Sequence, residues 1–182
     1  MAYLCKVFIL IFILLFCSGA AAPDKTAVIS VNKPETEKAE KLFKAVIPVK
    51  EGIIYTKVPR GLIISIDEKY FFNRGSIKIR KSSLVTLNAI ISVYQNLDNF
   101  CVIECHSDPD GVSDSDYQSN WGLTLARASN IVLYFIRYGN IKPDKIFGIG
   151  FGEFMPFKDN VSPNGNLDNR IDFVFIDYEA KR

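Results

Sequence analysis

Apolar residues recur at helical spacing in two long segments of the chain. Residues 83–97 and 119–139 each place branched or aromatic side chains three or four positions apart, which predicts two amphipathic helices. The second pattern ends at Gly139, whose missing side chain suits a left-handed C-terminal cap, and Pro143 prevents continuation. Its core face leaves Arg127 to one side, at the surface. The core-face residues of this helix are Leu125, Ala128, Ile131, Val132, Phe135 and Ile136.

Short β-branched runs surround the two helices. A hairpin is expected where Gly52–Tyr55 and Leu62–Ile66 flank a Pro-Arg-Gly turn. Phe100–Glu104 has the composition of a short buried strand, and the last two strands are expected at Lys145–Phe151 and Arg170–Tyr178. The order β-α-β-α-β-β predicts an α/β fold, a two-layer sandwich in which helices cover one face of a mixed sheet.

The first residues have the composition of a secretory signal peptide, expected to span residues 1–21. The apolar run Val7–Phe16 is short for a membrane span, which needs about 20 residues, and small residues follow it. A second interpretation stays open, because Leu14-Leu15-Phe16-Cys17 resembles a lipobox. In that case Cys17 is acylated and the acyl chains tether the protein to a membrane surface.

Residues 22–50 change in character. Pro23, Pro34 and Pro48, together with alternating Lys and Glu, predict an exposed lead-in or linker, with one short helix from Glu35 to Val46. Leu42, Phe43 and Val46 are expected to form the apolar side of this helix. The folded domain is therefore expected to cover residues 51–180. A simple spacer and a docking segment for a partner protein both remain open.

Composition and charge exclude some classes of function. A chain of 182 residues with 48% hydrophobic and 23% charged residues can bury one substantial core. The formal net charge is +2, and it falls to +1 if Lys6 is removed with the leader. No overall positive field is left to attract a nucleic acid, so no nucleic-acid partner is expected.

A polar stripe interrupts the start of the second helix. Asn120, Thr124 and Arg127 fall within about 60° of one another on the helix surface. The helix N-terminus adds unsatisfied N–H groups and partial positive charge, and the planar Arg127 fork matches a carboxylate. Just upstream, an acidic loop with Ser107 and Asp108 supplies the opposite sign. A cationic group beside an anionic one indicates a zwitterionic ligand.

These motifs resemble the OmpA-like peptidoglycan-binding domain over roughly residues 55–178. The resemblance rests on H-S-D-x-x-G from His106 and on S-N-W-x-L-T-x-x-R-A from Ser119, whose S-N-W detail is most similar to the branch found in the flagellar stator protein MotB. Arg60–Ser76 resembles that branch's first strand and turn, and Gly148–Pro156 and Asn169–Ile171 resemble its closing segments.

The resemblance implies non-covalent binding of peptidoglycan. In the family, the positions matching Asp108 and Arg127 hold the amine and the carboxylate of diaminopimelate in the stem peptide. Asn73 stands where the family usually has Asp, and Thr124 replaces a Ser. The full set of binding residues that the resemblance implies is Asp108, Arg127, Asn120, Ser107, Asn73, Thr124 and Arg170.

The resemblance also implies a place in the cell. We expect the periplasm or outer membrane of a Gram-negative bacterium, where the domain anchors an envelope protein or machine to the cell wall. Peptidoglycan, other envelope proteins and, through Cys17, a membrane are the expected partners. The alternative is an assembly lipoprotein of a secretion-system core complex whose domain docks proteins. A flagellar stator-like subunit is disfavoured, because Val7–Phe16 holds no acidic residue.

The sequence offers little for catalysis or metal binding. His106, Ser107 and Asp108 suggest a triad, but neighbours on one extended segment point to alternate faces. No paired general acid and base is evident, so we expect no enzyme. One His with Cys101 and Cys105 lacks metal-ligand spacing, so neither a metal nor another cofactor is expected. Four residues of extended chain also separate the two thiols by about 13 Å, too far for a disulfide.

The leader generates a direct test. We expect an exported protein whose mature N-terminus lies between Cys17 and Ala22, as measured by mass spectrometry of protein extracted from cells. A palmitate label that is lost in Cys17→Ala would establish the lipoprotein form. Finding Met1 on the extracted protein would contradict the export prediction.

Overall fold

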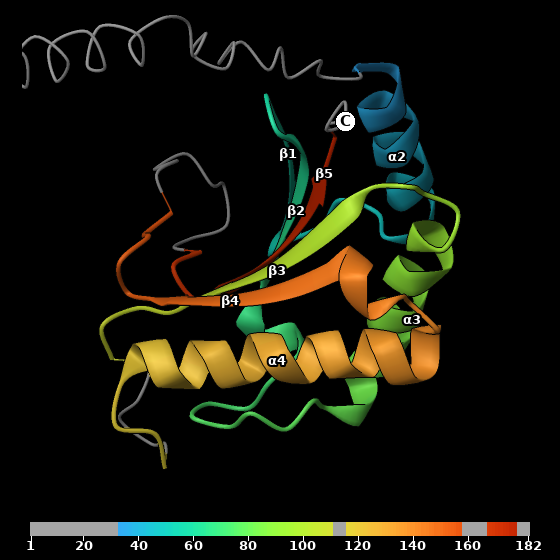
Figure 1. Cartoon of the computed structure of the whole chain (residues 1–182). Coiled ribbons are helices and arrows are strands. Elements are labelled where there is room, and N and C mark those ends of the chain that lie inside the picture. Colours follow the sequence, from blue (N-terminus) through green and yellow to red (C-terminus); the bar gives the residue numbers. More distant parts are fainter. Residues whose placement is uncertain (1–32, 111–115, 158–166, 178–182) are drawn as a thin grey trace, which may run out of the picture. The chain divides into compact units, whose positions relative to one another are not determined.

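The computed structural model describes residues 33–110, 116–157 and 167–177 (Figure 1). The predicted signal peptide and the lipidation candidate Cys17 lie outside these ranges. Of the helices within them, none is long and apolar enough to cross a membrane.

Five strands form one mixed sheet with the order β1-β2-β5-β3-β4. The β3–β4 pair is parallel and the other three pairs are antiparallel. The predicted hairpin is the β1–β2 pair, and the remaining strands lie within two residues of the predicted apolar runs. The strands are β1 (Ile53–Val58), β2 (Gly61–Asp67), β3 (Phe100–His106), β4 (Ile146–Gly152) and β5 (Arg170–Ile176).

The helices lie on one face of this sheet, so the predicted two-layer α/β fold is confirmed (Figure 1). Alternate residues of the central strands, such as Ile64, Ile103 and Phe173, meet Ile90 and Phe135 from the helices in one buried core. The helices are α2 (Lys33–Val46), α3 (Leu84–Tyr94) and α4 (Asn120–Gly139), with short 3-10 turns η1 (Glu68–Tyr70), η2 (Lys81–Ser83) and η3 (Pro143–Lys145).

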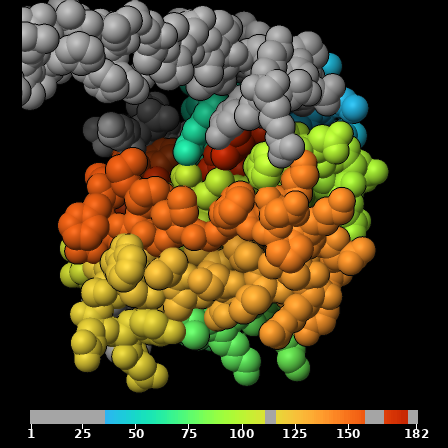
Figure 2. All heavy atoms as spheres, viewed as in Figure 1, coloured from blue at the N-terminus to red at the C-terminus, as the bar shows by residue number. Residues whose placement is uncertain are grey.

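Helix α4 packs closely along β4, and atoms of the two elements are in contact over the visible face in Figure 2. Gly150 makes this approach possible, because a Cβ there would lie 2.3 Å from the backbone nitrogen of Leu125. The first turns of α4, which carry the polar stripe, are thereby held directly against the sheet edge.

The exposed lead-in predicted for residues 22–50 is wrong from Lys33 onward. The predicted helix is present as α2, but Phe43 is fully buried, with its ring centroid 4.4 Å from that of Phe175. Thr36, Ala39 and Phe43 of α2 are buried, as is Ile47 directly after the helix, whereas Leu42 and Val46 are exposed. Helix α2 therefore belongs to the domain core, which begins before the predicted boundary at residue 51.

The C-terminal cap of α4 differs by one residue from the prediction. Gly139 is the last helical residue, and Asn140 adopts the left-handed conformation with φ 50°. Asn tolerates this region because its short polar side chain can form local hydrogen bonds. Gly139 serves packing instead, since a Cβ there would lie 2.7 Å from a methyl carbon of Ile91.

The buried face of α4 can be tested by truncation. Phe135 is fully buried and its ring centroid lies 6.0 Å from that of Phe173. Phe135→Ala should lower the free energy of unfolding by about 3–5 kcal/mol in denaturant titrations, because it leaves a cavity. Leu133→Ala, at a position 44% exposed on the same helix, should change it by only about 0.5 kcal/mol. Equal losses for the two variants would contradict this core.

Candidate functional site

The acidic loop is attached directly to the start of α4. Ser119 caps the helix, with its hydroxyl accepting from the Gly122 amide at 3.1 Å. The side-chain amide of Asn120 donates to the carbonyls of Asp108 and Pro109 at 3.2 and 3.0 Å. The structure therefore brings Asp108 and the helix N-terminus together, as the sequence indicated.

Arg127 is buried, which corrects its predicted surface position: only 1% of it is exposed. Its Nε donates to the Ser76 carbonyl at 2.9 Å, and Nη2 lies 3.4 Å from the Asn73 carbonyl. Nη1 donates to the carboxylate of Glu68, and the guanidinium lies over the Phe72 ring at 5.2 Å. The surface prediction failed because a segment about fifty residues earlier in the chain covers that side of α4.

Glu68 is a site residue that the sequence analysis missed. It lies in η1, directly after β2, and 17% of its side chain is exposed. Burial raises the pKa of this carboxyl, and the nearby Asp108 and Asp67 carboxylates add to the effect, so that together they outweigh Arg127. In the sequence, Glu68 is marked only by its position just after an apolar strand. Acidic residues are common at such positions, so this pattern alone does not identify a site.

Asp108 is half-buried and held in a fixed orientation. One of its carboxylate oxygens accepts from the Asp110 amide at 3.0 Å, and the other accepts from the Asn169 side chain. The Asn169 side-chain oxygen in turn accepts from the Asp108 amide at 2.9 Å. Asn169 lies in a segment that carried the family resemblance, although it was not among the predicted binding residues.

Three other predicted residues have different surroundings. Thr124 is fully buried, and its hydroxyl donates to the Asn120 carbonyl at 2.8 Å and accepts from the Gly152 amide at 3.0 Å. Thr124 thus joins α4 to β4. Ser107 is buried, and its hydroxyl has no partner among the described residues. Asn73 is exposed, and its carbonyl is the group that faces Arg127.

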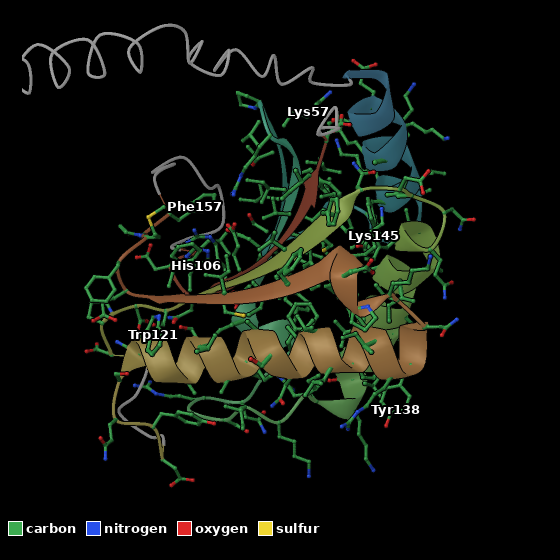
Figure 3. The ribbon with its side chains drawn as sticks, in the orientation of Figure 1. Lys57, His106, Trp121, Tyr138, Lys145 and Phe157 are labelled. Carbon is green, nitrogen blue, oxygen red and sulfur yellow. The ribbon has the colours of Figure 1, made fainter. Side chains whose placement is uncertain are left out.

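Arg170 lies away from the other predicted residues, on the sheet face opposite α4. Its Nε donates to Asp172 at 3.0 Å, and its guanidinium stacks over the Phe157 ring at 5.1 Å. Figure 3 shows Phe157 and His106 on that side of β4, whereas Trp121 marks the start of α4. The alternation of β5 explains this placement, because Ile171 faces the helices and its neighbour must face away.

A second polar cluster occupies this opposite face. Glu104, His106 and Asp172 bring potential ligand atoms within 4.8 Å of one another. Arg60 donates hydrogen bonds to both carboxylate oxygens of Glu104, at 3.0 and 3.1 Å, and Arg170 donates one to Asp172. Burial raises the pKa of Asp172, but His106 and Arg170 outweigh that effect and the pKa lies below its usual value. Two arginines thus balance two carboxylates, and a divalent cation would have to displace one of them.

The geometry also places His106 in this second cluster. Its Nε2 lies 3.2 Å from an Asp172 oxygen, although neither ring nitrogen has a well-aligned hydrogen bond among the described residues. The ring stacks on Phe151, with centroids 5.0 Å apart. The spacing of Glu104 and His106 two residues apart on one strand was a signal for this cluster that the sequence analysis did not use.

The burial of Arg127 makes a prediction about stability. Arg127→Ala leaves Glu68 without its cationic partner in a mostly buried position, so the free energy of unfolding should fall by about 3–5 kcal/mol. Arg137→Ala, at an exposed position of the same helix, should change it by about 0.5 kcal/mol or less. Urea titration of both variants measures the difference, and a loss at Arg127 no larger than at Arg137 would contradict the buried pair.

Two curated proteins of Bacillus subtilis are similar to this chain. YtxE, an uncharacterized protein, is 26% identical over 160 residues, which cover 81% of this chain and 66% of YtxE. Motility protein B is 30% identical over 117 residues, which cover 64% of this chain and 45% of that protein. The chain thus spans about two thirds of one relative and less than half of the other.

Solved structures share the fold. A MotB-like protein from Desulfovibrio vulgaris has a TM-score of 0.68 at 17% identity, covering 81% of this chain and 92% of its own. The periplasmic domain of Helicobacter pylori MotB has a TM-score of 0.63 at 20% identity, and the match covers 72% of this chain and 83% of that domain. The cell wall anchor of the T6SS from Pseudomonas aeruginosa has a TM-score of 0.59 at 20% identity, and the match covers 78% of this chain and 96% of that one.

A family profile agrees with the motifs and with the architecture. The profile of the OmpA family matches residues 71–170, which include the whole of α3, β3, α4 and β4 and end at the first residue of β5. The chain therefore belongs to the OmpA family, as its motifs predicted.

Proposed function

We propose that this domain binds peptidoglycan non-covalently and anchors an envelope protein or assembly to the cell wall. Membership of the OmpA family supports the proposal, as does the shared fold with a protein described as a cell wall anchor. The observation that carries it is the fixed carboxylate of Asp108 beside the start of the helix that holds the buried guanidinium of Arg127. Opposite charges are thereby oriented at one place.

The amine of a diaminopimelate centre fits the surroundings of Asp108. An ammonium group has three N–H donors and needs several acceptors. Two buried acceptors near Asp108 have no partner among the described residues, namely the Asn120 side-chain oxygen and the Ser107 hydroxyl. Buried polar groups are normally hydrogen-bonded, so these two atoms are candidates for contact with a ligand. In this proposal they join Asp108 in holding the ammonium.

The carboxylate of the same centre is assigned to Arg127. Nη1 of the guanidinium already pairs with a carboxylate, that of Glu68, while Nε and Nη2 face the carbonyls of Ser76 and Asn73. In this proposal the ligand carboxylate pairs with the Nη1 side. Of the other predicted binding residues, Asn73 is exposed and its carbonyl faces Arg127, while Thr124 bonds to the Gly152 amide and Arg170 to Asp172. The role is one of binding rather than catalysis.

The proposal also covers how the protein is attached to the envelope. The segment before Lys33 supplies export to the periplasm, and an acylated Cys17 would add a tether to a membrane surface, including the outer membrane. Binding to the wall at one end and to a membrane or a protein assembly at the other would make the domain an anchor. Other envelope proteins of a larger complex are the partners that such an anchor would hold.

Binding to purified sacculi tests the assignment of Asp108. Asp108→Ala removes a charge-assisted contact to the ammonium, so sacculus binding in pull-down titrations should weaken by about tenfold or more. Asp144→Ala, at an exposed position beyond the far end of α4, should leave binding unchanged. The wild type should also bind more weakly to walls that contain lysine in place of diaminopimelate, because lysine lacks the second carboxylate.

Equal binding to both wall types, or no effect of Asp108→Ala, would contradict this site. A domain that docks proteins within a secretion-system assembly would then be the better account.

A further inference from the structure

The fork of Arg127 is already occupied by the protein itself. Nη1 binds the Glu68 carboxylate, while Nε and Nη2 face the carbonyls of Ser76 and Asn73. The guanidinium is 1% exposed, so solvent does not compete for these positions. A ligand carboxylate that approaches Arg127 therefore meets a cation whose charge is already neutralised by Glu68.

We propose that Glu68 is a built-in competitor that regulates the proposed ligand site. Its carboxylate closes the Arg127 fork in the unliganded protein, and a ligand carboxylate binds by displacing it. This inference rests on the proposed function, because it assigns the regulation of that same site.

The two partners differ in how firmly they are held. Glu68 lies in a three-residue turn after β2, and 17% of its side chain is exposed. Arg127 has further contacts, with the Ser76 carbonyl at 2.9 Å and the Phe72 ring at 5.2 Å. The arginine would therefore stay in position when Glu68 leaves. Displacement exchanges one ion pair for another and leaves no buried charge unpaired.

The charges of the site favour a zwitterion over a simple carboxylate. Glu68 and Asp108 carry two negative charges against one positive charge on Arg127, and Asp67 lies close enough to raise the pKa of Glu68 as well. The Cys105 thiol behind them is buried, and burial raises its pKa, so it stays neutral. An ammonium is thus attracted to the unliganded site, whereas a lone carboxylate is repelled by Glu68.

Acidity should weaken the competitor. Burial raises the pKa of Glu68, so its carboxyl takes up a proton at a higher pH than an ordinary carboxylate does. Protonated Glu68 no longer neutralises Arg127, while the ligand carboxylate is still ionised. Ligand affinity should therefore rise as the pH falls from about 7 to about 5.

Titration calorimetry with a diaminopimelate-containing muropeptide tests the competitor. Glu68→Gln keeps the shape and an acceptor oxygen but removes the charge, so binding should tighten by about tenfold. Glu37→Gln, on the exposed surface of α2, is the matched control and should bind like the wild type. Between about pH 7 and pH 5, affinity should rise in the wild type and by much less in Glu68→Gln.

The possible outcomes separate the two proposals. If the wild type binds and Glu68→Gln binds equally or more weakly, Glu68 is no competitor while peptidoglycan binding stands. If neither protein binds although circular dichroism shows both folded, the proposed function fails and the regulation fails with it. If Glu68→Gln does not fold, the pH series on the wild type decides, and an affinity that does not rise towards acid overturns the competitor.

Discussion

The burial of the Arg127 guanidinium is the constraint on which the site depends. A charged group removed from water is tolerated only when it is paired and its donors are satisfied. Here the carbonyls of Ser76 and Asn73, the Phe72 ring and the Glu68 carboxylate together meet that requirement. The segment after β2 is thus fastened to α4, and the position of α4 is in turn set by its close contact with β4 at Gly150.

The two faces of the sheet solve the same electrostatic problem in different ways. On the helix side, Arg127 pairs with Glu68, and the Asp108 carboxylate acts electrostatically on the same Glu68 carboxyl, so these three groups carry one net negative charge. On the other side, two arginines balance Glu104 and Asp172 beside a histidine. Ion pairs of equal and opposite charge that are fully hydrogen-bonded stabilise the fold. A cluster with excess negative charge, by contrast, attracts an added cation. The difference in charge is why the ligand site is assigned to the helix side.

Local patterns predicted the fold well because each element carries its own signal. The helical spacing of α3 and α4 and the short β-branched runs of the strands are properties of short windows, and they needed no knowledge of distant contacts. Helix α2 shows the limit of this reasoning. Its helical character was visible in the sequence, but which side would be buried depended on Phe175, which lies more than a hundred residues away in the sequence.

The site could be predicted only in part, for a similar physical reason. The proximity of Asp108 and Asn120 could be predicted because each position is set by local structure, in a loop and at a helix start. The partners of Arg127 come from residues 68–76, and a helical projection contains no information about a segment that crosses over it. Arg170 is different, since the alternation of β5 already required it to face away from the helices.

A buried arginine that serves a ligand needs a substitute anion when no ligand is present. Leaving the guanidinium unpaired at 1% exposure would be far more costly than pairing it with a nearby carboxylate. Under the proposed competition, affinity depends on the difference between two carboxylates, that of the ligand and that of Glu68, rather than on the full strength of either ion pair. Such a site distinguishes between carboxylate ligands by the other groups that each ligand carries. An ammonium placed correctly against Asp108 supplies the difference, which is why a zwitterionic centre suits this arrangement better than an anion alone.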